Sequence, residues 1–179
     1  MEVSYLKHLD RMEHWQLGEL MASYGQEVWN LAYLLTRKHE MADDITQDVF
    51  LKAHANIRAF RGDSSIKTWL LTITRNLAIN SLRTAFMRKV TLVAWVMPQG
   101  AGPSAEQEAM DNEWTSRVWL NVLKLPVKLR EVLVLHAKYE MSTKDIAKML
   151  QLSEGTVKSR LSRARSKMSE YRRESEEYE

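Results

Sequence analysis

Two short helices are predicted by residues 142–167, which read STKDIAKMLQLSEGTVKSRLSRARSK. Ser142 is placed to cap the first helix, and Asp145 follows it in capping-box spacing. Ser153 is placed to cap the second helix, where Glu154 suits the positive end of the helix dipole. The pattern predicts a helix-turn-helix, a motif whose second helix enters the major groove of DNA.

The second of these helices carries one apolar stripe on an otherwise basic surface. The turn before it falls at residues 151–152, and Leu152 is expected to point into the core. The stripe recurs at helical spacing, as Val157, Leu161, Ala164 and Met168. Four side chains point away from the stripe: Lys158, Ser159, Ser162 and Arg163. A charge run is usually only a solvated surface, but residues 142–173 hold nine Lys or Arg against three Asp or Glu on an outward helix, which predicts DNA binding.

The composition limits the class of protein. A chain of 179 residues accommodates one large domain or two small ones. The absence of cysteine excludes disulfides and thiolate metal sites and is typical of a reducing compartment. The charged N-terminus lacks the apolar core of a signal peptide, and the longest apolar run, residues 90–97, is far shorter than the ~20 residues that span a bilayer. We therefore expect a cytoplasmic protein with no direct membrane insertion.

Charge is distributed unevenly along the chain. Residues 10–50 hold eight acids against three bases, whereas residues 58–89 hold seven bases against one acid. Residues 90–114 and the tail, residues 174–179, are acidic. Two basic regions in separate halves predict two contacts with a polyanion, and the acidic first region predicts a protein partner.

Three amphipathic helices are predicted before residue 90. They cover residues 17–35, a stretch from about Ala42 to Ile57, and residues 66–86, with a Gly- and Ser-containing loop at residues 60–65 before the third. The inward positions of the third helix are expected to be Ile66, Trp69, Leu70, Ile73 and Leu77. The spacing of Trp69 assigns it first to the core and second to the support of a binding pocket.

The pattern breaks at residues 90–103, which contain two prolines and two glycines. A capping box at Ser104 predicts a further helix over residues 105–123, and Pro126 suits the first turn of the next helix. The fold class is therefore all-α, with two small helical domains joined by a flexible linker and a helix-turn-helix in the second. The expected boundaries are an N-terminal domain at residues 10–89, a linker at 90–112, a C-terminal domain at 113–173 and an acidic tail at 174–179.

Four motifs, in the same order along the chain, resemble those of the extracytoplasmic-function (ECF) sigma factors of bacterial RNA polymerase. They are ADDITQDVF at residues 42–50; FRGDS at 60–64 with Thr68, Trp69, Leu70 and Asn76; LP at 125–126 with LREV at 129–132; and EGTVKSRL at 154–161 with Arg163, Ala164 and Arg165. Together they cover residues 18–167. The resemblance implies a promoter-recognition subunit that is not itself an enzyme.

The resemblance also implies roles for individual residues. Asp44, Gln47 and Phe50 resemble the surface that docks on the polymerase core, with Phe50 expected as an exposed aromatic anchor. The alternative from the sequence alone is a solvated acidic face with Phe50 half-buried. The loop at 60–65 and the helix after it resemble the part that captures the −10 promoter element as a melted single strand. The residues assigned to this contact are Phe60, Arg61, Gly62, Ser65, Arg75, Asn76 and Arg83, with Arg58 as a further phosphate contact.

The C-terminal domain resembles the part that reads the −35 element as duplex DNA. Lys158, Ser159, Ser162 and Arg163 match the positions that face the major groove. Phosphate contacts are assigned to Gly155, Thr156, Arg160 and Arg165. Some relatives carry an aromatic residue where Ser162 stands. The expected partners are polymerase core, promoter DNA and an anti-sigma factor, with no small-molecule substrate.

The linker departs from the family pattern. Residues 91–97, TLVAWVM, are apolar where a polar strand-like linker is typical, so we expect Trp95 to pack against its own domains, the polymerase or an inhibitory partner.

The sequence leaves two alternative functions. A LuxR-like helix-turn-helix regulator, which acts without core polymerase, fits residues 142–161 nearly as well but leaves residues 60–76 unexplained. A helical enzyme or metalloprotein is disfavoured, because the five histidines have no ligand spacing and no nucleotide-binding or nucleophile motif is present. We expect no cofactor and no catalytic or metal site.

Overall fold

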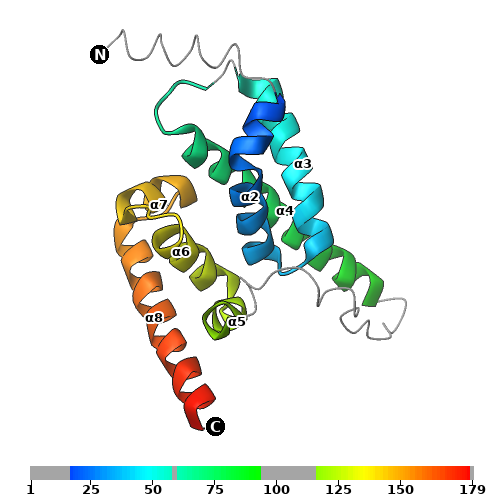
Figure 1. The fold of residues 1–179 in the computed structure, drawn as a ribbon. Coiled ribbons are helices and arrows are strands. Elements are labelled where there is room, and N and C mark those ends of the chain that lie inside the picture. Colours follow the sequence, from blue (N-terminus) through cyan, green and yellow to red (C-terminus); the bar gives the residue numbers. More distant parts are fainter. Residues whose placement is uncertain (1–16, 58–59, 94–115, 178–179) are drawn as a thin grey trace. The chain divides into compact units, whose positions relative to one another are not determined.

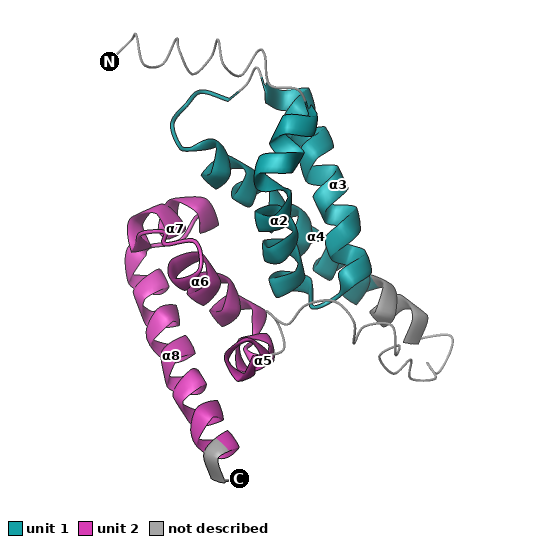
Figure 2. Cartoon of the chain, in the orientation of Figure 1, with its two compact units in different colours: residues 1–87 teal, residues 88–179 magenta. Residues whose placement is uncertain are grey.

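A computed structural model describes residues 17–57, 60–93 and 116–177, and within these ranges all regular structure is helical (Figure 1). The helices are α2 (Leu17–Thr36), α3 (His39–Asn56), α4 (Ile66–Val93), α5 (Arg117–Lys124), α6 (Val127–Ala137), α7 (Thr143–Leu150) and α8 (Glu154–Glu177). The chain divides into two compact units, residues 1–87 and 88–179 (Figure 2). The predicted all-α, two-domain fold class is confirmed. Nearly all of the expected linker, including Trp95, and the capping box at Ser104 lie outside the described residues.

The first unit is built on an antiparallel pair, α2 and α3 (Figure 1). The chain reverses at Arg37, whose φ of 60° is left-handed and whose N–H donates to the carbonyl of Tyr33 at 2.7 Å. Helix α3 begins at His39, three residues before the predicted start. The core between the two helices is made of the buried residues Val28, Leu31, Leu34, Leu35, Ala42, Ile45, Val49, Phe50 and Ala53.

Helix α4 buries a different stripe from the predicted one. Leu70 is buried as expected, but the other buried positions are Leu71, Thr74 and Ala78, while the remaining predicted positions, including Trp69, are only half-buried. Thr74 tolerates burial because its hydroxyl donates to the carbonyl of Leu70 at 2.8 Å, which satisfies the polar group. Apolar residues lie on several faces of α4, so periodicity alone did not identify the inward face.

The second unit packs α5, α6 and α7 against α8. Pro126 immediately precedes α6, and the buried guanidinium of Arg130 closes the α5–α6 turn by donating to the carbonyls of Leu123 at 2.7 Å and Leu125 at 3.1 Å. Farther along α6, Glu131 forms an ion pair with Arg160 of α8 at 3.2 Å. Helix α5 begins at Arg117, after Ser116 in an extended conformation, so the helix predicted over residues 105–123 is interrupted at Ser116, and residues 105–115 lie outside the described residues.

The helix-turn-helix has the predicted caps. The Asp145 N–H donates to Ser142 Oγ at 3.1 Å, and the Thr156 N–H donates to Ser153 Oγ at 3.1 Å. Gln151 ends α7 in the left-handed region, with a φ of 55°. Leu152 is half-buried rather than buried. The predicted stripe of α8 is confirmed at Val157, Leu161 and Ala164, which are buried, whereas Met168 is half-buried.

Within the described ranges, none of the helices combines the length and the hydropathy needed to cross a bilayer.

Candidate nucleic-acid interface

One face of α8 presents the residues predicted to read the major groove. Lys158, Ser162 and Arg163 are exposed, and Ser159 is half-buried. The Ser159 hydroxyl donates to the carbonyl of Thr156 at 3.1 Å, and the Arg163 guanidinium lies 3.5 Å from Ser159 Oγ. The caps on α7 and α8 orient this face, because they set the turn that presents α8 outward.

Glu154 sits at the start of this face and holds two other polar side chains. Its Oε1 accepts from Lys158 Nζ at 2.9 Å and from Thr143 Oγ1 at 2.8 Å. The hydrogen bond from Lys158, then that from Thr143, lowers the pKa of the Glu154 carboxyl below its ordinary value. Glu154 therefore stays ionised and partly offsets the charge of Lys158 in the absence of DNA.

The four residues assigned to phosphates have different environments. Gly155 is exposed, whereas the N–H of Thr156 already donates to the Ser153 cap. The guanidinium of Arg160 is held by Glu131, and the side chains of the pair are only 19% and 3% exposed. Arg165 is exposed and has no side-chain partner among the residues that the structure describes. Of the two arginines, Arg165 is the one available to a new anion.

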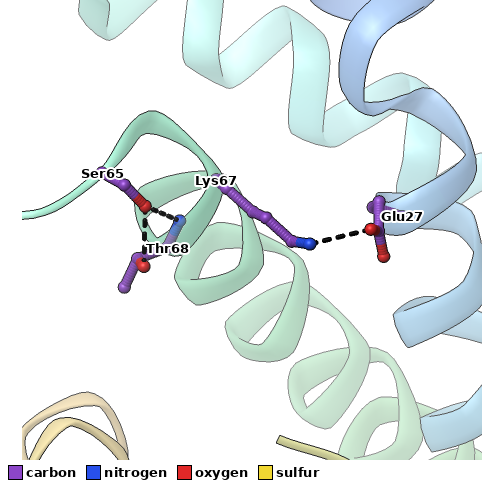
Figure 3. Close-up of polar contacts among 4 residues, drawn as sticks. All are labelled: Glu27, Ser65, Lys67 and Thr68. Carbon is purple, nitrogen blue, oxygen red and sulfur yellow. Dashed lines mark hydrogen bonds and ion pairs between the residues drawn. The ribbon is translucent and has the colours of Figure 1, made fainter. Parts of the chain in front are cut away.

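The predicted DNA contacts in the loop before α4 differ in their exposure. Arg61 and Gly62 are exposed, and Gly62 has a φ of 72°, which favours glycine. Phe60 is only 6% exposed, and its ring packs 5.1 Å from that of Trp69, so it contributes at most the wall of a pocket. Ser65 caps α4: its Oγ accepts from the Thr68 N–H at 3.0 Å and lies 2.9 Å from Thr68 Oγ1 (Figure 3).

The amide predicted to read a base lies farther along α4. Asn76 and Arg83 are exposed, Arg75 is half-buried, and Arg75 Nη1 is 3.4 Å from Asn76 Oδ1. Eleven residues separate Ser65 from Asn76, which is about 16 Å along a helix axis. A single base cannot touch both, so the loop and Asn76 are suited to different nucleotides of one strand. Arg58 lies outside the described residues.

The acidic face of α3 carries the residues assigned to polymerase docking, with one correction. Asp44 and Gln47 are exposed, but Phe50 is 1% exposed and belongs to the core of the first unit. The expectation of an exposed aromatic at this position is wrong, because Phe50 follows Val49 on the buried side of α3 and widens its apolar stripe. The exposed apolar residue is the next one, Leu51, which is 59% exposed.

Comparison with known proteins places both units in one family. Residues 20–85 match the family Sigma-70 region 2, and residues 121–168 match Sigma-70, region 4. The chain belongs to the ECF sigma factors. It is 28% identical over 171 residues to ECF RNA polymerase sigma factor SigW of Bacillus subtilis, covering 89% of this chain and 90% of SigW. It is 33% identical over 162 residues to RNA polymerase sigma factor YlaC of the same organism, covering 89% and 91%, and 31% identical over 156 residues to ECF RNA polymerase sigma factor SigM of Mycobacterium tuberculosis, covering 87% and 76%.

Two solved structures resemble the chain as well. The sigma factor RpoE from Bartonella quintana, solved in complex with the anti-sigma factor NepR, aligns with a TM-score of 0.69 and 26% identity, covering 87% of this chain and 96% of that one. CnrH, solved in complex with the cytosolic domain of CnrY, aligns with a TM-score of 0.59 and 27% identity, covering 86% and 84%.

Two contacts of this sigma factor escaped the sequence reasoning. Lys67, in the first turn of α4, pairs with Glu27 of α2 at 2.8 Å, so its charge is partly offset within the region 2 unit (Figure 3). Trp29 Nε1 of α2 donates to Asp43 Oδ1 of α3 at 2.7 Å and so holds the acidic face against α2. Each pair joins different helices, and no spacing within one helix signals it.

A small aromatic cluster surrounds the second contact. Trp29 stacks on Tyr33 with ring centroids 5.3 Å apart, and His39 lies 4.5 Å from the Tyr33 ring. Desolvation by burial raises the pKa of the Tyr33 hydroxyl above its ordinary value. The cluster stabilises the turn from α2 into α3.

Proposed function

We propose that this chain directs bacterial RNA polymerase core to promoters whose −35 element is read as duplex and whose −10 element is read as melted single strand. The observation that carries this function is the pairing of a region 2 unit with a region 4 unit in one chain. Catalysis belongs to the polymerase, since sigma factors are not enzymes. The protein acts in the cytoplasm, where its polymerase works.

In the second unit, α8 reads the −35 element. Lys158 and Arg163 are exposed donors suited to guanine O6 and N7, and a bidentate contact of this kind discriminates by about 1–3 kcal/mol. Ser159 and Ser162 supply shorter donors on the same face. Arg165 and the Gly155 amide contact phosphates and fix the register of the helix.

In the first unit, the loop at residues 60–65 and helix α4 hold the melted strand. Arg61 and Arg83 are exposed cations that attract its phosphates, and Asn76 offers an amide to the edge of an extruded base. The capture of unstacked bases drives opening of the duplex without nucleotide hydrolysis, because bound bases cannot re-pair.

The acidic face of α3 docks on the polymerase core. Asp44 and Gln47 are exposed there beside Leu51, so the surface combines negative charge, an amide and an apolar side chain. Charged residues steer association, and a central apolar residue supplies binding energy. We also propose that an anti-sigma factor binds this chain, since RpoE of Bartonella quintana was solved with its anti-sigma factor NepR.

The test is assembly on a promoter. Core polymerase from the same organism, with and without this chain, is titrated with a fork-junction promoter whose −10 element is single-stranded, and binding is measured by gel shift. We expect a complex only when both are present, and a strong loss in the combined variant Asn76→Ala and Lys158→Ala. The matched control is Asn56→Ala with Arg173→Ala, two exposed residues outside the proposed contacts.

Two outcomes would contradict the proposal. If the combined variant bound the promoter as tightly as wild type, Asn76 and Lys158 would not be the residues that read it. Tight, specific binding of closed duplex by the chain alone would favour a LuxR-like regulator that acts without polymerase. The match of residues 20–85 to sigma-70 region 2 favours the sigma factor, because a LuxR-like regulator has no need of that unit.

A further inference from the structure

The start of α3 is tied to α2 by one short hydrogen bond. Trp29 Nε1 of α2 donates to Asp43 Oδ1 of α3 at 2.7 Å, a distance typical of a charge-assisted bond. Trp29 is half-buried and Asp43 is exposed, so the bond lies at the surface of the first unit. The bond joins two different helices, and its geometry therefore depends on how α2 and α3 pack.

Neighbouring rings hold the indole of Trp29 in place. It stacks on the ring of Tyr33, one turn later in α2, with an interplanar angle of 13° and centroids 5.3 Å apart. The ring of His39, the first residue of α3, also lies 5.3 Å from that of Trp29. A side chain packed by two rings has few other rotamers open to it, so its N–H is directed at Asp43 before any partner binds.

The bond acts on the helix that carries the proposed docking face. Asp44, Gln47 and Leu51 lie at i, i+3 and i+7, so they share one face of α3, and all three are exposed. Asp43 borders this face, but its carboxylate is bonded to α2. Two adjacent acids of α3 therefore have different environments: Asp44 belongs to the docking face, whereas Asp43 joins the two helices.

The orientation of the docking face depends on the rotation of α3 about its own axis. Side-chain tips lie about 5–6 Å from a helix axis, so a rotation of about 15° displaces them by about 1.5 Å. Groups that bind a partner must be held to within about 0.5 Å for their full effect. The bond to α2 resists such a rotation, because Asp43 cannot turn with α3 without leaving the indole N–H of Trp29.

We propose that Trp29 is a positioning residue for polymerase docking. Through Asp43 it fixes the rotation of α3 and thereby the direction of the docking face formed by Asp44, Gln47 and Leu51. Trp29 does not itself contact the polymerase, and Asp43 serves as the acceptor of the bond rather than as a charge that the partner reads. The inference rests on the proposed function and deepens it, because it assigns roles to two residues outside the docking face.

Binding of the full chain to core polymerase tests this proposal. Each variant is labelled at its N-terminus and titrated with core from the same organism, and anisotropy gives the affinity at low and at high salt. Trp29→Phe keeps a stacked ring but lacks the N–H, and it should weaken binding about tenfold with an unchanged salt dependence. Asp43→Ala removes the acceptor and should give the same loss. Asp43→Asn retains an acceptor oxygen and should bind within about twofold of wild type.

A double variant separates positioning from direct contact. Trp29→Phe combined with Asp43→Ala should lose no more affinity than either single variant, because both act through one bond. Asp44→Asn, in contrast, should weaken binding with a shallower salt dependence, because its charge faces the partner. The matched control is Glu27→Gln, which weakens a contact of α2 with α4 rather than with α3 and should bind within about twofold of wild type.

Four results would overturn the proposal. These are wild-type affinity of Trp29→Phe for core, additive losses in the double variant, an equal loss in Glu27→Gln, and a loss in Asp43→Asn as large as that in Asp43→Ala. The last result, with a shallower salt dependence, would make Asp43 a direct contact through its charge. Asp43 is exposed, so Asp43→Ala leaves no cavity and keeps the test decisive even if Trp29→Phe folds poorly. Failure of the wild-type chain to bind core would instead refute the proposed function.

Discussion

The ion pair between Glu131 and Arg160 gives the sharpest test of how the second unit is built. Arg160 was predicted to contact DNA phosphate, but in the structure its Nη1 lies 3.2 Å from Glu131 Oε1 and holds α6 against α8. Removing one partner of a buried pair costs about 3–5 kcal/mol, because the remaining charge is left without compensation. Glu131 is 3% exposed, but Arg160 retains 19% exposure, so partial solvation places the cost near the lower end, at about 3 kcal/mol.

The assay is hydrogen exchange of the α6 and α8 amides in Arg160→Met. A loss of about 3 kcal/mol in opening free energy speeds their exchange about 150-fold, since each 1.36 kcal/mol is a factor of ten. The double variant Arg160→Met with Glu131→Leu should recover most of the protection, because an apolar pair of similar volume replaces the ionic one. Arg173→Met, an exposed arginine on the same helix, is the matched control.

A structural role for Arg160 would be refuted if Arg160→Met exchanged like wild type yet lost DNA affinity with a shallower salt dependence. Arg160 would then be a phosphate contact, as first expected, and the pair with Glu131 would have no measurable structural effect. An unprotected double variant would show instead that the charges themselves, and not their mutual compensation, stabilise the unit.

Four further predictions concern Glu154, Ser65, Phe50 and Leu51. Glu154→Gln should tighten holoenzyme binding to any duplex about fivefold at low salt, because it frees Lys158 and removes a negative charge near phosphate. Anisotropy measures this affinity, and an affinity equal to that of wild type would contradict the prediction. Because the pKa of the Glu154 carboxyl is lowered in the folded protein, its contribution to stability is present above the unfolded pKa and is lost as pH falls through the folded pKa. In an acid titration followed by circular dichroism, wild type should lose this contribution and Glu154→Gln should not. Ser65→Ala should destabilise the first unit by about 1 kcal/mol through loss of the α4 cap, measured by urea unfolding, and an unchanged midpoint would exclude the cap. Phe50→Ala should cost about 3–5 kcal/mol of stability in the same assay, because it leaves a cavity in the core. Leu51→Ala should leave stability within about 0.5 kcal/mol but weaken binding to core polymerase about fivefold. The reverse pattern would show that Phe50 is the docking anchor.

The interface combines local and long-range features, and they differ in how far the sequence revealed them. The caps at Ser142 and Ser153, the turn at Gln151 and three of the four predicted stripe positions of α8 are present. Each involves residues three or four apart, so the interaction is encoded in a window that can be read directly. The exposure of Lys158 and Arg163 followed from the same periodicity.

Misjudged positions have another origin. Phe50 and Leu51 are adjacent apolar residues on α3, and only packing against the rest of the first unit decided which one is buried. On α4, the side chain of Thr74 entered the core because the Leu70 carbonyl satisfied its hydroxyl, an option that hydropathy does not register. In both cases, tertiary packing decided how wide the buried face of the helix is and in which direction it points.

The sequence by itself determined the helices, the caps of the helix-turn-helix, the family and the two basic regions, because these depend on short-range periodicity, on hydrogen bonds between near neighbours, or on composition. Only the tertiary structure decided which charges are available to a partner. Lys67 pairs with Glu27 across 40 residues and Arg160 with Glu131 across 29, and these contacts separate cations held by the protein from cations available to DNA. The physical reason is that an ion pair between helices depends on how the helices pack, and packing is a property of the whole unit rather than of any local stretch.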